Sequence, residues 1–294
     1  MSSAPILQFG CGPQPQFELG EPCFLFGKCR THGDLTGLLD YILNMSLKAL
    51  VRDSLRKSGY LIQKYPSVSF PSLRVFDLSV QLLMALKGEA LNFIQVGAND
   101  GDFGDPLRQY ILKYPWRGIL VEPQPVIFAK LLNNYSGVKD RLIFENVAIG
   151  SGVQSIALYR APGNHGSGSQ SDTHAASVVS VNPRVAATQL GVKPTDLERF
   201  LVPCTTLDEL IAKHGTSKID ILQIDTEGHD YNVLKTIDLA RTTPLIIQFE
   251  HGHLTRGEIN DAVTYLSAHG YRILYGGYQT DTLALHSSFP SPVS

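Results

Sequence analysis

The chain has 294 residues, of which 43% are hydrophobic and 18% charged, a balance typical of a globular protein with one large or two small domains. Its formal net charge of -2 gives no general electrostatic reason to expect nucleic-acid binding, and no apolar run is long enough to span a membrane. The first residues lack the basic flank and apolar core of a secretory signal, so we expect a cytoplasmic location.

The first 88 residues are predicted to form an arm followed by a helical segment. Residues 1–33 are rich in Gly, Pro and Cys without a sustained hydrophobic period, which predicts an irregular arm. Residues 34–88 carry apolar side chains at three- and four-residue steps, which predicts a helical preamble whose second helix begins near Asp77 and ends at Gly88. Its basic, amphipathic part either packs on the core or attaches to a membrane surface or a partner. Residues 89–294 are predicted to form one α/β domain.

The stretch from Asn92 to Gly101 has the pattern of a buried strand that ends in a glycine turn. Gly97 and Gly101 let the backbone turn sharply and pass close to a ligand, because neither carries a Cβ. A helix is expected from about Pro106, a residue that suits a first helical position. Strand, glycine turn and helix together form the entry unit of a nucleotide-binding α/β sheet.

The residues inside this turn differ from the G-x-G-x-x-G pattern that binds a dinucleotide. Asn99 and Asp100 fill the turn, so a carboxylate stands where a pyrophosphate would otherwise lie. A carboxylate there repels phosphate and attracts an ammonium group, such as the amino-acid end of S-adenosylmethionine (SAM). The alternative is an ordinary tight turn in which Asp100 faces solvent.

Two further strands are predicted to end at the same edge of the sheet. Residues 118–121 form a short apolar run before Glu122 and Pro123, about 20 residues after the turn, where the acid that binds an adenosine ribose is expected. The third predicted strand, 142–150, contains Asn146 near its carboxyl end, where it could meet the adenine or the ribose. The alternative for Glu122 is a simple strand-end acid.

The pattern weakens between the third strand and the next helix. Residues 155–159 alternate in polarity and predict an extra antiparallel strand. Residues 161–200, rich in Gly, Ser and His at their start, predict one long loop that either closes over an acceptor or is a disordered insertion. Thr206 has the position of an N-cap before the following helix.

Polar side chains cluster at and just after the carboxyl ends of the fourth and fifth predicted strands, residues 218–225 and 244–251. These side chains are Asp225, Glu227, His229, Glu250 and His251. Chemistry in an α/β sheet is expected at the carboxyl ends of its strands. A helix over 258–269 and a closing pair of strands, 271–275 and 281–285, complete the predicted sheet.

With these motifs assembled, the chain resembles the FkbM family of SAM-dependent methyltransferases over about residues 90 to 285. The matching blocks follow the family's order and are residues 96–101, 121–123, 146–150, 206–210 and 224–228. The resemblance implies a class I methyltransferase fold, a Rossmann-like, seven-stranded, mostly parallel sheet flanked by helices, with SAM across its carboxyl edge. It also implies O-methylation of a hydroxyl group on a sugar, a glycan or a related natural product.

The resemblance, together with the motifs, indicates which residues bind the cofactor. They are Gln95, Gly97, Asn99, Asp100, Gly101, Glu122, Pro123, Asn146, Ala148 and Asp225. Many methyltransferases carry an acid two residues before the first glycine, and this chain departs from them with Gln95. Because glutamine adds no charge, we expect Asp100 to supply the negative charge that the cofactor's ammonium group needs.

Methyl transfer to a hydroxyl requires in-line alignment and a general base that accepts the hydroxyl proton. The candidate catalytic residues are Asp225, Glu227, His229, Glu250 and His251. His229 titrates nearest to neutral pH and is a reasonable base, the alternative being a helix N-terminal residue that moves no proton. Asp225 and Glu250 also suit a Mg²⁺ ion that holds two sugar oxygens, although nothing in their spacing requires a metal.

Two other functions fit parts of the same pattern. A nucleotide-dependent sugar dehydrogenase or epimerase is disfavoured by the missing G-x-G-x-x-G. The Tyr-x-x-x-Lys pair of Tyr231 and Lys235 lies behind the acidic cluster, and we interpret it as chance. A non-catalytic SAM-binding module is disfavoured by the intact cluster. We expect a small-molecule or glycan acceptor, no nucleic-acid partner and no transmembrane segment, while homo-oligomerisation stays open.

Overall fold

The computed structural model describes residues 75–289 except 103, 163–177, 217 and 276–280. The predicted arm over 1–33 and most of the predicted preamble over 34–88 therefore lie outside the described residues. The elements, in chain order, are α3 (Val75–Lys87), β1 (Asn92–Val96), α4 (Arg108–Lys113), β2 (Arg117–Val121), α5 (Pro125–Asn134), η1 (Ser136–Arg141), β3 (Leu142–Glu145), β4 (Ala148–Ile149), β5 (Ser155–Arg160), α7 (Pro183–Leu190), η2 (Pro194–Asp196), β6 (Glu198–Thr205), α8 (Leu207–His214), β7 (Ile221–Ile224), α9 (Asp230–Leu234), β8 (Ile246–Glu250), α10 (Arg256–Ala268), β9 (Tyr271–Tyr275) and β10 (Asp281–His286).

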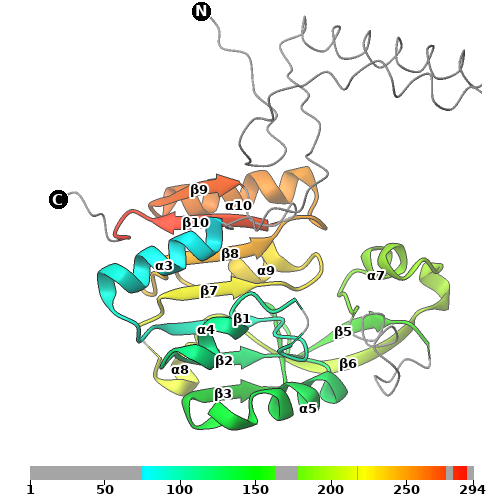
Figure 1. Ribbon diagram of the computed structural model, residues 1–294. Helices are drawn as coiled ribbons and strands as arrows, with labels where there is room; N and C mark the ends of the chain where they lie inside the picture. The colour runs from blue at the N-terminus through cyan, green and yellow to red at the C-terminus, as the bar shows by residue number, and fades with distance from the viewer. Residues whose placement is uncertain (1–74, 103, 163–177, 217, 276–280, 290–294) are drawn as a thin grey trace, which may run out of the picture. The chain divides into compact units, whose positions relative to one another are not determined.

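A seven-stranded sheet in the order β3-β2-β1-β7-β8-β10-β9 forms the centre of the described part of the chain (Figure 1). Strands β3, β2, β1, β7 and β8 pair in parallel, and β10 pairs antiparallel with both β8 and β9. This arrangement confirms the predicted mostly parallel, Rossmann-like sheet flanked by helices. The strand order reverses between β1 and β7, and such a switch point is where open α/β sheets bind their ligands.

The two faces of the sheet carry separate apolar cores because side chains alternate along each strand. On β1, Ile94 and Val96 pack with α8, α9 and α10 on one face, whereas Phe93 packs with α3, α4 and α5 on the other. Helices α3 and α5 lie in front of the sheet in Figure 1 and α10 lies behind it. Strands covered on both faces explain the near-continuous apolar runs in the sequence.

The chain's single tryptophan lies in the core on the α3 face. Trp116 is fully buried, and its ring stacks on Tyr110 at a centroid separation of 5.1 Å and an interplanar angle of 6°. Its ring also contacts Phe93 of β1 at a centroid separation of 6.0 Å. The aromatic cluster therefore joins α4 to the central strand at a place that does not belong to the pocket described below.

A second, three-stranded sheet in the order β4-β6-β5 lies beyond the carboxyl edge of the main sheet, together with α7 (Figure 1). The predicted extra antiparallel strand is β5, which pairs with β6. Ser155 lies opposite Pro203 at one end of this pairing, and Arg160 lies opposite Glu198 at the other. Thr206 caps α8 through a capping box with Glu209, as its position predicts. This second sheet forms one wall of the site.

Two predicted segments differ from the observed structure. The third strand was predicted to run over 142–150, but the chain leaves the main sheet after β3, and Ala148–Ile149 pairs with β6 instead. The break occurs at Asn146, whose side-chain amide donates to the carbonyl oxygen of Glu122 at 2.8 Å. The predicted loop over 161–200 contains α7, which Asn182 caps through the amide of Arg184 and which ends at a left-handed glycine, Gly191.

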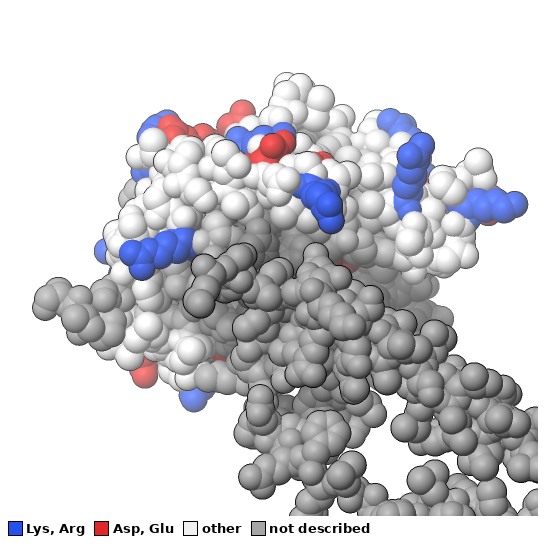
Figure 2. All heavy atoms as spheres, turned by 90° about the horizontal axis from the view of Figure 1, so that it is seen from above, with Lys and Arg blue, Asp and Glu red and all other residues white. Residues whose placement is uncertain are grey.

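The described surface carries mixed charges, as the near-zero net charge suggests. Lys and Arg side chains are interspersed with Asp and Glu over the upper part of the described surface in Figure 2. Among the described helices, none is long and apolar enough to cross a membrane.

Candidate cofactor and active site

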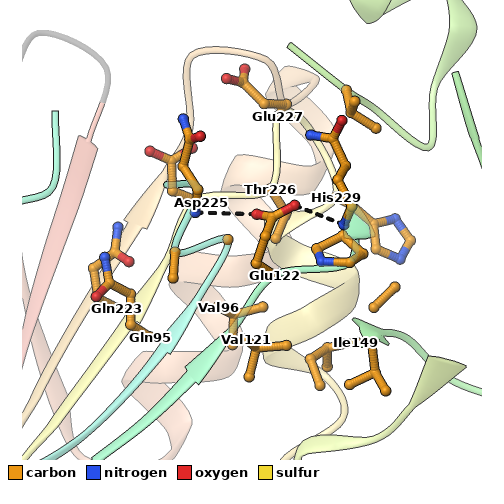
Figure 3. Close-up of a pocket in the computed structure, with 18 of the residues that line it drawn as sticks. Gln95, Val96, Val121, Glu122, Ile149, Gln223, Asp225, Thr226, Glu227 and His229 are labelled. Atoms are coloured by element: carbon orange, nitrogen blue, oxygen red, sulfur yellow. Dashed lines mark hydrogen bonds between the residues drawn. The ribbon is translucent and has the colours of Figure 1, made fainter. Parts of the chain in front are cut away.

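A pocket of about 220 Å³ lies at the carboxyl ends of β1, β2 and β7, at the switch point of the main sheet. Its lining changes in polarity from one end to the other (Figure 3). One end is apolar and is formed by Val147, Ala148, Ile149, Leu158, Val179 and Val181. The other end is polar and is formed by Gln95, Asp105, Gln223, Asp225 and Glu227, with Glu122 between the two.

The glycine turn after β1 brings the backbone close to β7. Gly97 has a φ of +79°, and a Cβ there would overlap the carbonyl oxygen of Asp225. The amides of Gly97 and Ala98 both donate to the carbonyl oxygen of Val121, at 3.0 and 2.9 Å. Asn99 adopts a φ of +50°, a conformation that asparagine tolerates better than most residues. These constraints fix the floor of the pocket.

Glu122 is buried and is held by two backbone amides. Its Oε2 accepts from the amide of Asn99 at 3.1 Å and its Oε1 accepts from the amide of Gln124 at 2.8 Å (Figure 3). Burial raises the pKa of Glu122 to about 7, although both hydrogen bonds act to lower it. Each carboxylate oxygen has a second lone pair, so Glu122 can still accept from two hydroxyl groups.

The predicted cofactor residues fall into two groups. Those that line the pocket are Gln95, Gly97, Asn99, Glu122, Pro123, Ala148 and Asp225. Asp100, Gly101 and Asn146 are not part of its lining. The Asp100 carboxylate accepts from the amide of Asp102 at 3.0 Å, within its own turn, and Gly101 packs against the ring of Tyr135.

A second acid, which the sequence reasoning did not identify, lies at the polar end. The Oδ1 of Asp105 accepts from the side-chain amide of Gln95 at 3.0 Å and from the backbone amides of Leu107 and Arg108 at 2.8 and 3.1 Å. Its Oδ2 accepts from the Tyr135 hydroxyl at 2.5 Å. Burial raises the pKa of the Asp105 carboxyl despite these four donors. The only local signal was an acid directly before Pro106, at the start of a helix.

The acids after β7 and β8 lie together at the polar end of the site. Asp225 lines the pocket, and its residue is exposed there although protein atoms surround its carboxyl group. Burial, followed by the charges of Asp230, Glu227 and Asp281, raises its pKa well above the ordinary value. Burial and the neighbouring carboxylates, Asp225 first among them, raise the pKa of Glu250 to about 9. The cluster therefore shares protons at neutral pH.

Glu227 and Glu250 are brought together with a histidine that was absent from the predicted site. His253 Nε2 lies 3.3 Å from Glu227 Oε2 and 3.6 Å from Glu250 Oε1. The ligand-type atoms of these three residues all lie within 4.8 Å of one another. Gln189 of α7 contacts both Glu227 and His253 through its side-chain amide. This group does not include Asp225, which the sequence paired with Glu250 as a Mg²⁺ site.

Neither of the two predicted catalytic histidines belongs to the group of Glu227, Glu250 and His253. His229 is the N-cap residue of α9 and lines the pocket, with Glu122 between it and Asp225 in Figure 3. Burial lowers the pKa of His229, so its imidazole is neutral at pH 7. His251 is not part of the pocket lining, and its Nδ1 lies 2.9 Å from the Thr282 hydroxyl.

Asp230, another acid of this cluster, has a structural role. Its fully buried carboxylate accepts from the Thr226 hydroxyl at 2.9 Å and from the Glu250 amide at 3.1 Å. These bonds tie the turn after β7 to the end of β8, which fixes the relative positions of Asp225 and Glu250.

Comparison with known proteins relates this geometry to one family. The FkbM methyltransferase domain matches residues 95–273, more than half of the chain. No curated protein gives a significant match.

Solved structures show distant similarity. The chain is similar to the FkbM methyltransferase from Methylobacillus flagellatus KT at 15% identity and a TM-score of 0.43, over 67% of this chain and 44% of that one. It is also similar to the N-terminal domain of human METTL16 at 11% identity and a TM-score of 0.42, over 83% and 81% of the two chains. A third is precorrin-6y C5,15-methyltransferase from Geobacter metallireducens GS-15, at 12% identity and a TM-score of 0.36, over 75% and 93%. The match spans less than half the length of the first of these chains.

Proposed function

Because the chain belongs to the FkbM methyltransferase family, we propose that it transfers the methyl group of SAM to a hydroxyl group of a sugar, a glycan or a related natural product. The observation that carries the proposal is the graded polarity of a single pocket at the switch point of the sheet. The polarity of SAM changes in the same way along its length, from the adenine through the ribose to the charged amino-acid end. The chain's residues would bind these parts in that order.

The apolar end of the pocket suits the adenine ring, and His229 adds a neutral imidazole to the same wall. Glu122 stands where it can accept from both ribose hydroxyls, because its carboxylate is already oriented by two backbone amides. The polar end beyond Gly97 is left for the amino-acid end and the reacting methyl group. His229 would then contact the cofactor and not act as the general base.

The acceptor would lie beside Asp225, at the mouth of the polar end. The acceptor oxygen attacks the methyl carbon, the carbon–sulfur bond breaks with its electron pair going to sulfur, and the hydroxyl proton moves to a carboxylate. The products are a methyl ether and S-adenosylhomocysteine (SAH). We assign proton acceptance to Asp225, because its side chain faces the cavity, and alignment of the acceptor to Glu227 and Glu250.

A metal ion is not required by this mechanism. Divalent metal ions are nevertheless commonly bound by carboxylates and imidazoles, and Glu227, Glu250 and His253 provide two carboxylates and one imidazole. A chelator separates the two cases: activity that is lost with EDTA and restored by Mg²⁺ would add a metal to the acceptor site, and unchanged activity would exclude one.

The rival dehydrogenase function is disfavoured by the position of the Tyr231 and Lys235 pair. The ammonium group of Lys235 lies over the ring of Tyr231 at 4.5 Å from its centroid, and neither residue lines the pocket.

The full chain incubated with methyl-labelled SAM and a panel of sugars and glycosides tests the proposal. We expect SAH and a product whose label resists alkaline hydrolysis, as an ether does and an ester does not. Binding of NAD in calorimetry without binding of SAH would overturn the proposal.

A further inference from the structure

Two buried glutamines face the polar end of the pocket from neighbouring strands. Gln95 of β1 and Gln223 of β7 are register partners, so their side chains lie on the same face of the sheet. Their side chains line the pocket and are only 2% and 4% exposed (Figure 3).

Neither glutamine oxygen has a hydrogen-bond donor within the part of the chain that the structure describes. A buried acceptor without a donor is destabilising, so two of them side by side on a cavity call for a ligand that donates.

The orientation of Gln95 is set by Asp105. Its side-chain nitrogen donates to Asp105 Oδ1 at 3.0 Å, which directs the oxygen of the same amide away from the carboxylate. Asp105 is itself held by the Tyr135 hydroxyl and two backbone amides. An amide whose nitrogen donates to a carboxylate is polarised, and its oxygen becomes a stronger acceptor.

The group that fits two such oxygens is an ammonium. It offers three N–H donors and no acceptor, whereas a carboxylate or phosphate would meet the two oxygens with like polarity. The part of the pocket lining that the structure describes contains neither Lys nor Arg.

We propose that Gln95 and Gln223 bind the ammonium group of SAM's amino-acid end, and that Asp105 is the positioning residue that orients Gln95 and supplies the negative charge. This inference rests on the proposed function and deepens it. It replaces the sequence-based expectation that Asp100 supplies the charge, because Asp100 lies outside the pocket lining and its carboxylate accepts within its own turn.

The chain offers a matched control for these residues. Gln248 of β8 is the register partner of Gln223, is 4% exposed and also has an oxygen without a donor among the described residues. Its side-chain nitrogen donates to Asp281 at 2.5 Å, as that of Gln95 does to Asp105, but Gln248 does not line the pocket. Gln248→Met therefore removes the same kind of buried amide as Gln95→Met, at a position that does not contact the proposed ligand.

The test is calorimetry on the full chain with SAH, with deaminated SAH, and with methylthioadenosine, which lacks the amino-acid end. Gln95→Met and Gln223→Met conserve volume and remove the oxygen, and each should weaken SAH by about tenfold while leaving methylthioadenosine unchanged. Asp105→Asn should weaken the binding of SAH more than the binding of methylthioadenosine. A general loss of stability would weaken the binding of both ligands to the same extent. Gln248→Met should change neither affinity.

The deaminated ligand tests the inference on the wild-type chain, whatever the variants do to folding. We expect the wild type to bind deaminated SAH about tenfold more weakly than SAH. We also expect Gln95→Met to bind deaminated SAH with the same affinity as the wild type, because the ammonium group that Gln95 would contact is absent. Variants that bind SAH as tightly as the wild type, or that lose methylthioadenosine in parallel, would overturn the inference and leave the methyltransferase proposal standing. Failure of the wild type to bind either adenosine ligand would instead overturn the proposed function.

Discussion

Gly97 is the position at which side-chain volume is most tightly limited in the site. It combines a φ of +79° with a backbone so close to β7 that an added Cβ would overlap the carbonyl oxygen of Asp225. Close backbone approach of β1 and β7 is what allows Gln95, Gln223 and Asp225 to face a common cavity. A single methyl group would therefore act on the geometry of three side chains.

Gly97→Ala is expected to destabilise the protein by roughly 2 kcal/mol or more and to abolish SAH binding, because the added Cβ both strains φ and overlaps a carbonyl oxygen. Gly152→Ala is the matched control, since Gly152 has a φ of +78° and no heavy atom within 4 Å of a Cβ. It should cost about 1 kcal/mol and leave SAH affinity unchanged. Equal losses for the two variants in denaturant unfolding would show that strain alone matters.

Glu122 predicts a pH dependence of both stability and binding. Its folded-state pKa of about 7 exceeds its ordinary value of 4.5, so the folded apoprotein retains a proton that the unfolded chain releases. This group therefore makes the apoprotein less stable as pH rises from 4.5 to about 7. Ribose hydroxyls prefer the ionised carboxylate, so SAH affinity should rise with pH through about 7. Calorimetry across that range checks this, and a flat profile in Glu122→Gln is the control.

At the scale of elements, the ends of β7 and β8 gather carboxylates that repel one another. The loop after β7 is held by the β5–α7 segment: the Ser180 hydroxyl donates to the Glu227 carbonyl at 2.6 Å, and Gln189 contacts the Glu227 carboxylate. Glu227 accordingly tolerates a φ of +55°, which is unusual for a residue with a Cβ. Three segments distant in sequence thus assemble the polar end of the pocket.

This cluster should lose a proton when the sulfonium of SAM binds beside it. Glu250 has a pKa of about 9 and is protonated at neutral pH in the free protein, and an adjacent positive charge favours ionisation. SAM and SAH differ by the methyl group and its charge, so proton release should be greater with SAM. Calorimetry in buffers of different ionisation enthalpy measures the difference, and Glu250→Gln should reduce it. Equal release with both ligands would place the sulfonium away from Glu250.

Asp225→Asn should lower the rate of methyl transfer by about a hundredfold or more while SAH affinity changes little, because the variant keeps the shape of the side chain but accepts no proton. His229→Asn, by contrast, should weaken cofactor binding more than turnover at saturating SAM. The opposite pattern of the two variants in steady-state kinetics would restore His229 as the base.

At the scale of the whole molecule, α3 belongs to the core that supports β1. Leu83 is fully buried in the core that contains Phe93, whereas the neighbouring Leu82 is 37% exposed. Leu83→Ala should therefore destabilise the protein by about 3 kcal/mol, and Leu82→Ala by about 1 kcal/mol or less. Similar midpoints for both variants in denaturant unfolding would contradict this packing.

The inner strands and the position of Glu122 could be predicted because they depend on local patterns. Apolar runs marked the inner strands, and the rule that parallel strands end at one edge brought Gly97, Glu122 and Asp225 to one pocket. The bend after β3 could not be predicted, because apolar residues resume directly after Glu145 and Asn146. The hydrogen bond from Asn146 to Glu122, which marks the bend, joins residues just beyond the ends of two strands.

The residues missed at the site depend on contacts between distant segments. Asp105 meets Tyr135 and Gln95 through folding alone, and His253 meets Glu227 only because two loops converge. Helix α7 was missed although Asn182 and Gly191 are ordinary start and stop signals, because the polar sequence before it suggested a continuous loop.

The lone indole of Trp116 gives this molecule an intrinsic optical reporter. Since the ring is sealed in the aromatic cluster and takes no part in the cavity, its emission should stay blue and unchanged when an adenosine ligand is added. It should shift to the red only when the layer around Phe93 opens to water. Fluorescence can therefore follow global unfolding of every variant above without interference from occupancy.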